Sequence, residues 1–406
     1  MSTQSNRSII LAVIVSALGY FVDVYDLLLF SVVRIASLKD LGIPDSEILS
    51  TGVFLINSQM AGLLSGGILW GILGDKRGRL SVLFGSIVLY SIGNILNAFV
   101  HDVNTYALLR FITGVGLAGE LGAGITLVSE ILPSKVRGYA TTIIASVGVA
   151  GAVAAALVGD TFYWRTTYVI GGVMGLLLLL LRVAVNESGL FNAIKESKVA
   201  KGDIRLLFNS WPRFIKYLSC IVIGIPIWYA VGIIITFSPE IGKALAMSEI
   251  PSAGRSVFYS YIGLTVGDLT SGLLSQYLKS RKQAIFIFIT ITGITSAIIL
   301  SSHQISLSNF YIGTWILGFA TGYWAVFVTT AAEQFGTNLR ATVTTTVPNF
   351  VRGSVIPITS LFNYWKDSVG VLASALSVGT ICIALAILAA IAIPESFGKE
   401  LEFLEE

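Results

Sequence analysis

The chain has 406 residues, of which 54% are hydrophobic and only 12% are charged, and its formal net charge is +3. Soluble domains average roughly 45–50% apolar and about 25% charged residues. This composition excludes an ordinary soluble domain, indicates a lipid bilayer as the solvent, and gives no sign of a nucleic-acid partner. Cys220 and Cys382 both lie in apolar segments, so we expect neither a disulfide framework nor a metal site.

Apolar runs long enough to span a bilayer, about 20 residues each, recur along the whole chain. They cover residues 9–34, 50–73, 80–99, 105–128, 139–159, 166–185, 214–238, 256–278, 284–301, 309–331, 341–363 and 370–393. Six runs precede the polar segment 187–213 and six follow it. We therefore predict an all-α integral membrane protein with twelve transmembrane helices, in two six-helix bundles at 1–186 and 214–406 joined by a cytoplasmic connector.

The placement of Lys and Arg sets the expected orientation. These residues are concentrated in the connector and in the loops that share its side of the membrane, which by the positive-inside rule predicts that both termini are cytoplasmic. The first apolar run contains Asp23 and Asp26 and lacks a small-residue cleavage site, so it is not expected to be a cleavable signal peptide. We expect a multi-pass protein of the plasma (inner) membrane, and a monomer, because twelve spans in one chain suffice.

One pattern occurs twice. The segments Glu130 to Arg137 and Glu333 to Arg340 each place a Glu seven positions before an Arg, half a chain length apart, between two apolar runs. Parallel repeats of this kind are typical of one large transporter class. A loop after the second run, Gly71 to Arg79, adds Asp75 and Arg79 four residues apart, a spacing that brings them together on a helical turn. A positive-inside anchor is the alternative interpretation of this loop.

These motifs carry a resemblance. The Gly71 to Arg79 loop is similar to the signature of the major facilitator superfamily, and the Glu130 to Arg137 segment resembles its second cytoplasmic signature in the sugar-porter and metabolite:proton symporter branches. Asn186-Glu187-Ser188 and Pro394-Glu395-Ser396 resemble the Pro-Glu-Ser ends of sugar porters. The resemblance implies the major facilitator fold, with two bundles rocking about a central site. It also implies a cytoplasmic gate, closed in the outward-facing state, formed by Asp75, Arg79, Glu130, Arg137, Glu333 and Arg340.

The second half departs from this signature. Its corresponding loop, Leu278 to Gln283, contains neither Asp nor Gly. We therefore expect the C-terminal half of the gate, assigned to Glu333 and Arg340, to be weaker than the N-terminal half.

Charged side chains inside apolar runs are candidate functional residues, because each costs roughly 2.5–3.5 kcal/mol at the bilayer centre. Asp23 and Asp26 lie about 21 and 25 Å into the first run and share a helix face. Arg110 enters the fourth run from the outer side by about two turns, which allows an Asp26–Arg110 pair. The pair resembles that of proton-coupled members of the family and predicts proton coupling. A permanent structural bridge is the alternative.

Glu120 lies deeper in the fourth run, after a string, Gly114 to Gly119, that matches a dinucleotide-binding pattern. No strand precedes this string, so that interpretation fails. Glu120 resembles the central acid of metabolite:proton and phosphate:proton symporters, and we predict a second proton-carrying or substrate-binding carboxylate. A purely structural partner of a basic residue is the alternative.

Arg352 lies about 16 Å into the eleventh run, beside Asn349 and between Pro348 and Pro357, which loosen the helix. Asp268 of the eighth run is its expected partner, so a closed Asp268–Arg352 bridge is the alternative to an anion site. An Arg fork suits a carboxylate or phosphate. Amide and aromatic side chains at similar depth complete the predicted substrate site: Asn57, Gln59, Trp228, Tyr229, Tyr323 and Trp324.

The sequence favours a transporter over an enzyme, since it shows no nucleophile–base pair, metal-ligand cluster or cofactor motif. The first hypothesis is proton-coupled import of a small polar metabolite, most simply an organic anion, with protons, substrate and bilayer as the only partners. An amino-acid or other zwitterion symporter is the second. A drug:proton antiporter is disfavoured because the segment Gly148 to Ala152 of the fifth run lacks the Gly-Pro of such antiporters, and a non-transporting receptor stays open.

Overall fold

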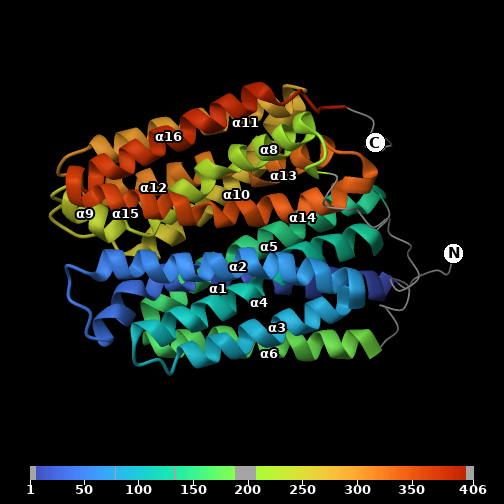
Figure 1. Ribbon diagram of the computed structural model, residues 1–406, viewed down its shortest axis with the longest axis horizontal. Helices are drawn as coiled ribbons and strands as arrows, with labels where there is room; N and C mark the ends of the chain where they lie inside the picture. Colours follow the sequence, from blue (N-terminus) through green and yellow to red (C-terminus); the bar gives the residue numbers. More distant parts are fainter. Residues whose placement is uncertain (1–5, 78, 132–133, 188–206, 399–406) are drawn as a thin grey trace. The chain divides into compact units, whose positions relative to one another are not determined.

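The computed structural model describes residues 6–77, 79–131, 134–187 and 207–398, and the regular elements within these ranges are all helices (Figure 1). Some helix-end side chains, among them those of 74–81 and 120–143, lie outside the described set. Backbone contacts divide the chain into unit 1, residues 1–44 with 54–200, and unit 2, residues 45–53 with 201–406. The all-α prediction is confirmed, while the exact domain boundary stays a prediction because 188–206 are not described.

Each apolar run of the first half falls on one continuous helix. The helices are α1 (Asn6–Asp40), α2 (Ile48–Arg77), α3 (Arg79–Asn97), α4 (Val103–Ile131), α5 (Ser134–Thr161) and α6 (Trp164–Glu187). The start of α4 shows why a helix begins where it does. The Asp102 carboxylate accepts a hydrogen bond from the Thr105 backbone N–H at 2.9 Å, which satisfies one of the donors that a helix N-terminus leaves open.

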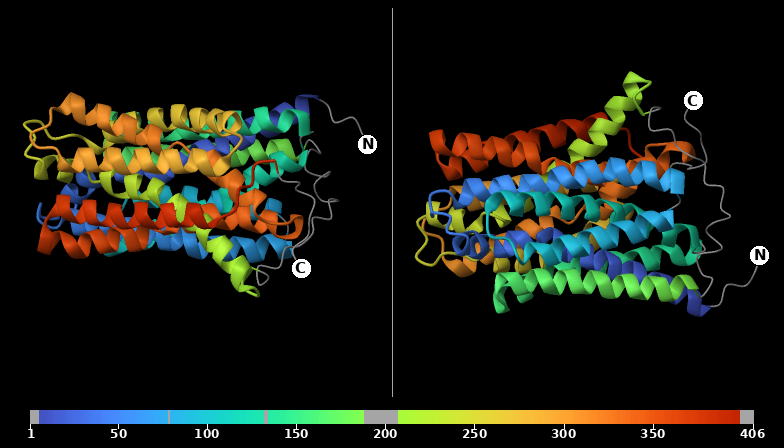
Figure 2. Two further views of the ribbon diagram at one scale, coloured as in Figure 1. Left: turned by 90° about the horizontal axis from the view of Figure 1, so that it is seen from above. Right: turned by 60° about the horizontal axis from the view of Figure 1, so that its bottom comes forward.

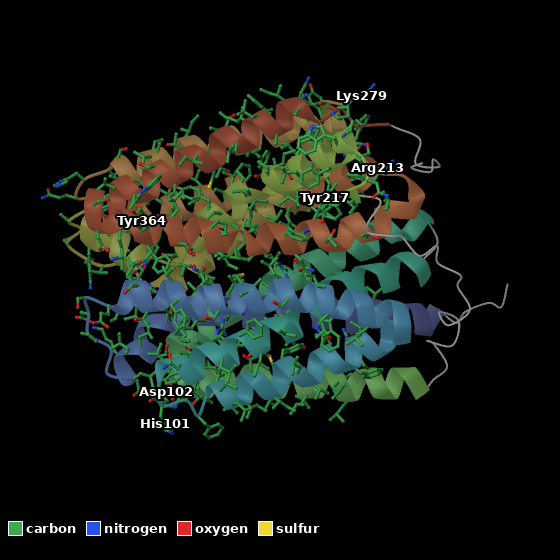
Figure 3. The ribbon with its side chains drawn as sticks, in the orientation of Figure 1. His101, Asp102, Arg213, Tyr217, Lys279 and Tyr364 are labelled. Carbon is green, nitrogen blue, oxygen red and sulfur yellow. The ribbon has the colours of Figure 1, made fainter. Side chains whose placement is uncertain are left out.

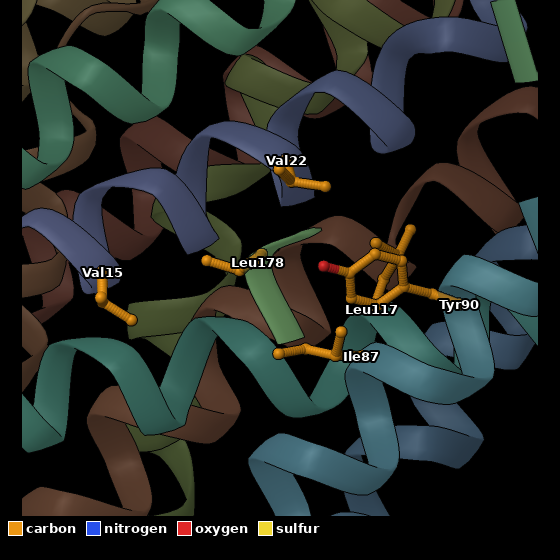
Figure 4. Close-up of a cluster of buried hydrophobic side chains, with 6 residues drawn as sticks. All are labelled: Val15, Val22, Ile87, Tyr90, Leu117 and Leu178. Atoms are coloured by element: carbon orange, nitrogen blue, oxygen red, sulfur yellow. The ribbon is translucent and has the colours of Figure 1, made fainter. Parts of the chain in front are cut away.

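Unit 1 has a core shared by four helices. Figure 4 shows its buried side chains, which come from α1, α3, α4 and α6: Val15, Val22, Ile87, Tyr90, Leu117 and Leu178. Glycines bring other helix pairs into backbone contact, as small residues do in membranes. A Cβ added at Gly151 of α5 would lie 2.1 Å from the Phe21 carbonyl oxygen of α1, and one at Gly114 of α4 would lie 2.1 Å from the Gln59 carbonyl oxygen of α2.

The helices of the second half are more interrupted. They are α8 (Trp211–Tyr229), the π-helix η2 (Ala230–Ile235), α9 (Ser238–Ala244), α10 (Ala253–Tyr277), α11 (Arg281–Ser301), α12 (Leu307–Thr321), α13 (Trp324–Glu333), α14 (Thr337–Gly353), α15 (Val355–Val369) and α16 (Val371–Ala392). Three of the predicted runs, 214–238, 309–331 and 341–363, therefore consist of two or more elements. The N-terminal end of α8, which carries the exposed Trp211, projects from its own unit (Figure 2).

Local chemistry explains these interruptions. Pro226 lies inside α8 and cannot donate a backbone hydrogen bond. The following π-helix is widened, with the Thr236 N–H bonding to the Val231 carbonyl at 3.1 Å. Between α12 and α13, Gly322 is pressed against α10, since an added Cβ would lie 2.6 Å from the backbone nitrogen of Asp268. The break between α14 and α15 falls at Ser354, whose hydroxyl donates to the Val351 carbonyl at 2.6 Å.

The helix ends agree with a multi-pass arrangement within each unit. His101 and Asp102 lie together at one end of unit 1, and Tyr364 and Lys279 lie at opposite ends of unit 2 (Figure 3). Seven helical segments among the described residues are long and apolar enough on their own to cross a membrane. They are Val13–Asp40, Ile48–Trp70, Trp164–Arg182, Trp211–Ile235, Arg281–Ser301, Leu307–Glu333 and Val371–Ala392.

Candidate functional site

The first candidate site is an acidic centre on α1 in unit 1. Asp23 and Asp26 are both fully buried. Asp26 lies in electrostatic range of Asp23 and of Arg110 on α4, with the Asn94 amide of α3 beside it. On α6, an added Cβ at Gly171 would lie 2.5 Å from Asp26 Oδ1, so the absent side chain makes room for the carboxylate. Within the described residues, neither oxygen of Asp26 accepts a hydrogen bond of ordinary geometry.

Arg110 is also fully buried, and its closest partner differs from the one expected. Its Nη2 donates to Gln59 Oε1 of α2, whereas the sequence allowed a pair with Asp26. The guanidinium carbon lies 4.9 Å from the Phe30 ring centroid and 5.9 Å from that of Tyr168. Cation–π contacts of this kind stabilise a cation that has left water. The structure therefore brings Asp26 and Arg110 into one cluster without bonding them to each other.

Aromatic hydroxyls surround this cluster, and sequence reasoning did not find them. The Tyr106 and Tyr168 hydroxyls lie 2.6 Å apart, and Tyr106 donates to Ser37 Oγ at 3.5 Å. Tyr25 donates to the Thr167 carbonyl at 3.0 Å. These tyrosines carry no charge at neutral pH, so a search for intramembrane charges passes over them. Asn94 was missed for the same reason, although a polar amide inside an apolar run was a usable signal.

The second candidate site lies in unit 2 at the end of α14. Arg352 and Asn349 are 2% and 4% exposed, in the last turns before the break at Ser354. The neighbouring Val351 packs on α8, where an added Cβ at Gly224 would lie 2.8 Å from its methyl groups. The turn that carries Arg352 is thus held against α8 by glycine contact.

Asp268 of α10 contacts a helix end, whereas Arg352 was its expected partner, and its role in substrate binding stays a prediction. Its Oδ1 accepts a hydrogen bond from the Ala325 backbone N–H at 3.2 Å, in the first turn of α13. A carboxylate at a helix N-terminus satisfies open donors and matches the positive end of the helix dipole. The structure gives Asp268 this partner in place of the expected Arg352, so Asp268 serves as a cap for the half-helix α13.

The remaining predicted substrate residues of unit 2 differ in availability. Tyr229 is buried against α16, where its hydroxyl donates to the Ala375 carbonyl at 2.9 Å, and Tyr323 donates to the Ile223 carbonyl at 2.9 Å. Trp324 is half-buried and lies against Phe327, with ring centroids 5.4 Å apart and the ring planes tilted by 53°. The indole nitrogen of Trp228 is buried and has no hydrogen-bond partner among the described residues, which makes Trp228 the stronger candidate for a polar contact. In unit 1, Gln59 is held by Arg110, and Asn57 is half-buried.

A polar network closes one end of unit 2, formed by Ser280, Arg281, Glu333, Glu395 and Ser396. The Arg281 guanidinium lies 3.3 Å from the Glu333 carboxylate, and Ser396 Oγ donates to the same carboxylate at 2.7 Å. Glu395 accepts bonds from Ser280 Oγ and from the Arg281 backbone N–H. Burial alone would raise the pKa of Glu395, but these hydrogen bonds outweigh it and hold the pKa below its ordinary value. The loop without Asp and Gly thus contributes Arg281, a residue absent from the predicted gate.

Several predicted residues cannot be placed. The side chains of Asp75, Arg79, Glu120, Glu130, Arg137 and Arg340 lie outside the described residues, so their roles stay predictions. In the part of the chain that is described, no group of three or more His, Cys, Asp or Glu side chains could hold a metal ion. Cys220 and Cys382 are buried, free cysteines.

Comparison with known proteins gives a consistent result. A model of the Major Facilitator Superfamily matches residues 9–360. The chain is 25% identical over 413 residues to a probable 4-methylmuconolactone transporter of Cupriavidus pinatubonensis, covering 96% of this chain and 91% of the relative. It is 27% identical over 297 residues, 71% of each chain, to the 3-(3-hydroxy-phenyl)propionate transporter of Escherichia coli.

Solved structures agree on the fold. The crystal structure of a D-xylose-proton symporter superimposes with a TM-score of 0.69 at 17% identity, covering 97% of this chain and 100% of the other. The family model spans most of the chain, including the helices that carry both candidate sites. This protein belongs to the major facilitator superfamily of membrane transporters and is not an enzyme.

Proposed function

We propose that the protein imports a small organic anion, of the carboxylate class, together with protons by alternating access. The observation that carries the proposal is the buried carboxylate of Asp26, whose oxygens accept no ordinary hydrogen bond from the described residues, next to Asp23 and Arg110. An ionised carboxylate away from water is costly unless it is paired. A proton or a movement of Arg110 would relieve that cost, which links protonation to conformation.

Arg352 supports an anionic substrate. It is a guanidinium deep in unit 2, and its fork geometry matches a carboxylate. The transporter of Escherichia coli reported above is named for a propionate that carries a phenyl ring. Trp228 and Trp324, in the same unit, would supply apolar surface for a ring in such a substrate, as aromatic side chains do in ligand pockets. The zwitterion alternative is weakened because Asp268, a candidate negative pole, is engaged by the N-terminus of α13.

The interrupted helices of unit 2 suit the proposed motion. Discontinuous helices surround substrate sites in secondary transporters, and breaks at η2, Gly322 and Ser354 give short segments that can reorient. The network of Arg281, Glu333 and Glu395 would tie one end of these segments in one state and release it in the other. We further propose an inner-membrane location with cytoplasmic termini, on the basis of the Lys and Arg distribution, and a monomer, because twelve spans in one chain suffice.

The test is uptake into proteoliposomes with a panel of labelled carboxylates, amino acids and sugars. We expect accumulation of a carboxylate such as 3-(3-hydroxyphenyl)propionate or benzoate when the outside is acidic. If the uptake of every accepted solute is independent of an imposed pH gradient, the proposal of proton coupling is wrong. Uptake of amino acids with no uptake of carboxylates would replace the anion by a zwitterion. Binding without accumulation under any gradient would identify a receptor.

A further inference from the structure

We propose that Gln59 is a positioning residue that competes with Asp26 for the guanidinium of Arg110. The inference rests on the proposed function in taking Asp26 as the proton-carrying group. It changes the role of Gln59, which was predicted to contact substrate. It also gives Arg110 two alternative positions, one bonded to Gln59 and one bonded to ionised Asp26.

The contact between Gln59 and Arg110 is built into the packing of α2 on α4. Gln59 is 1% exposed, and its Oε1 accepts the hydrogen bond from Arg110 Nη2. The two helices touch at this level, since an added Cβ at Gly114 would lie 2.1 Å from the Gln59 carbonyl oxygen. One turn along α2, an added Cβ at Gly62 would lie 2.0 Å from the Phe111 carbonyl oxygen. Glycine contacts on both sides therefore fix the Gln59 side chain next to Arg110.

The position of Arg110 leaves Asp26 within reach. The guanidinium lies over Phe30, which is four residues after Asp26 and so on the same face of α1, about one turn further along the helix, at a rise of roughly 6 Å. A long arginine side chain covers such a distance by rotamer changes alone. Both Asp26 oxygens can accept, because no described residue gives them an ordinary hydrogen bond.

The other groups that face Asp26 are too weak to replace Arg110. They are Asp23 and Tyr25 on α1, Asn94 on α3, and Tyr168 on α6, while α5 meets this stretch of α1 with Gly148 and Gly151. Asp23 repels the ionised form, and Tyr25, Asn94 and Tyr168 are neutral. The guanidinium is therefore the main stabiliser of ionised Asp26, and whatever holds it elsewhere favours the protonated form.

The hydrogen bond from Arg110 to Gln59 has an intermediate strength that suits this competition. A hydrogen bond from a charged donor to a neutral amide oxygen is stronger than a neutral pair but weaker than an ion pair. Arg110 would thus stay on Gln59 while Asp26 is protonated and return to Asp26 when the proton leaves. The bistable element is one side chain with two acceptors of unequal charge.

The test measures protonation of Asp26 directly and needs no substrate. In purified protein in lipid, the carboxylic-acid stretching band that is lost in Asp26→Asn is followed by infrared spectroscopy as the pH is changed. In Gln59→Leu, Arg110 has no neutral acceptor and should bind Asp26, so the midpoint should fall by about one unit or more. In Gln59→Glu, the guanidinium is held more firmly and negative charge is added, so the midpoint should rise.

Asn97→Leu is the matched control. Asn97 is a buried amide of the same unit that bonds to Thr113 of α4 at 3.2 Å, three residues from Arg110, and its loss should leave the midpoint unchanged. Equal midpoints in wild type, Gln59→Leu and Gln59→Glu would overturn the proposal, as would a band that never titrates. A midpoint that shifts as expected while proteoliposome uptake ignores pH would retain this inference and reject the proposed function.

Discussion

The two units of the protein place their charges on different kinds of helix. In the described ranges of unit 1, Asp23, Asp26 and Arg110 lie on uninterrupted helices that glycines hold in backbone contact. In unit 2, Arg352 and Asp268 flank breaks, one in the last turn of α14 and one capping α13. Under the proposed function, the difference teaches that proton coupling, which depends on a charge balance, is set in a rigid frame, whereas substrate recognition is set where the backbone can reorient.

The proposed proton-carrying role of unit 1 can be tested most directly at Asp26. Asp26→Asn keeps the shape but removes the titrating group, so we expect proton-driven accumulation to fall by roughly a hundredfold or more. Exchange of labelled for unlabelled substrate, which needs no net proton movement, should persist. Both are measured in proteoliposomes.

Asp40→Asn is the control on the same helix. Asp40 lies at the exposed C-terminal end of α1 and pairs with Arg165 at 3.1 Å. Exposed pairs contribute about 0–1 kcal/mol, so this variant should accumulate substrate as wild type does. Normal accumulation by Asp26→Asn would remove the proton-carrying role from unit 1.

A smaller effect, a loss of substrate affinity, is expected from substitution of Arg352. Arg352→Gln removes a charged donor, and hydrogen bonds to charged groups contribute about 1.5–3 kcal/mol. The KM for a carboxylate should therefore rise roughly ten- to hundredfold, while the pH dependence of uptake is unchanged. Arg255→Gln, at an exposed position in the first turn of α10, is the control. A shifted pH profile with an unaltered KM in Arg352→Gln would reverse the division between the units.

Much of this division could be predicted from sequence. Hydropathy places the apolar runs on which most helices lie, because each span must be apolar over its whole length, but it misses α9 and the breaks within three runs of unit 2. The common depth of Asp26 and Arg110 follows from the helical rise alone. The hydrogen-bond partner of Arg110 cannot be predicted in this way. Choosing between Gln59 and Asp26 requires the rotation of α2 about its axis, and glycine contacts with α4 set that rotation.

The helix breaks in unit 2 also show that contacts between packed helices cannot be predicted from sequence alone. Pro348 and Pro357 indicate a weak point near Arg352, and the structure has one at Ser354. Gly322 alone predicts nothing, because an isolated glycine is tolerated in a helix. Its break depends on contact with the backbone of Asp268, and the Asp268 cap on α13 depends on the break. Both are properties of packed helices, so a single sequence does not reveal them.

The rigidity of unit 1 can be tested with one methyl group. In Gly171→Ala, the added Cβ would lie 2.5 Å from Asp26 Oδ1, so the carboxylate or α6 must move, at a cost of about 1–3 kcal/mol. We expect a lower unfolding temperature and a shifted pH profile of uptake. Gly272→Ala on α10 has no atom within 4 Å of its added Cβ and should gain about 0.5–1 kcal/mol. Equal behaviour of the two variants would show that unit 1 adapts and is not a rigid frame.

The smallest expected effect concerns the network at the end of unit 2. Hydrogen bonds hold the pKa of Glu395 below its ordinary value of 4.5, against the opposing effect of burial. A lowered pKa means that ionised Glu395 stabilises the folded protein fully above about pH 4.5, and that this contribution is lost as the pH falls through the folded value.

Glu395→Gln should therefore unfold roughly 2–4 °C below wild type at neutral pH, and the gap should close as the buffer is acidified towards pH 3. The measurement is a pair of thermal unfolding curves at each pH, with Glu333→Gln alongside. The Glu333 pair with Arg281 involves side chains only 14% and 13% exposed, so its loss leaves a charge poorly hydrated and should cost more than the loss of Glu395. A constant difference in unfolding temperature for Glu395→Gln across this pH range would mean that the network depends on shape and not on charge. The proposed reorientation in unit 2 would then be supported by the interrupted helices alone.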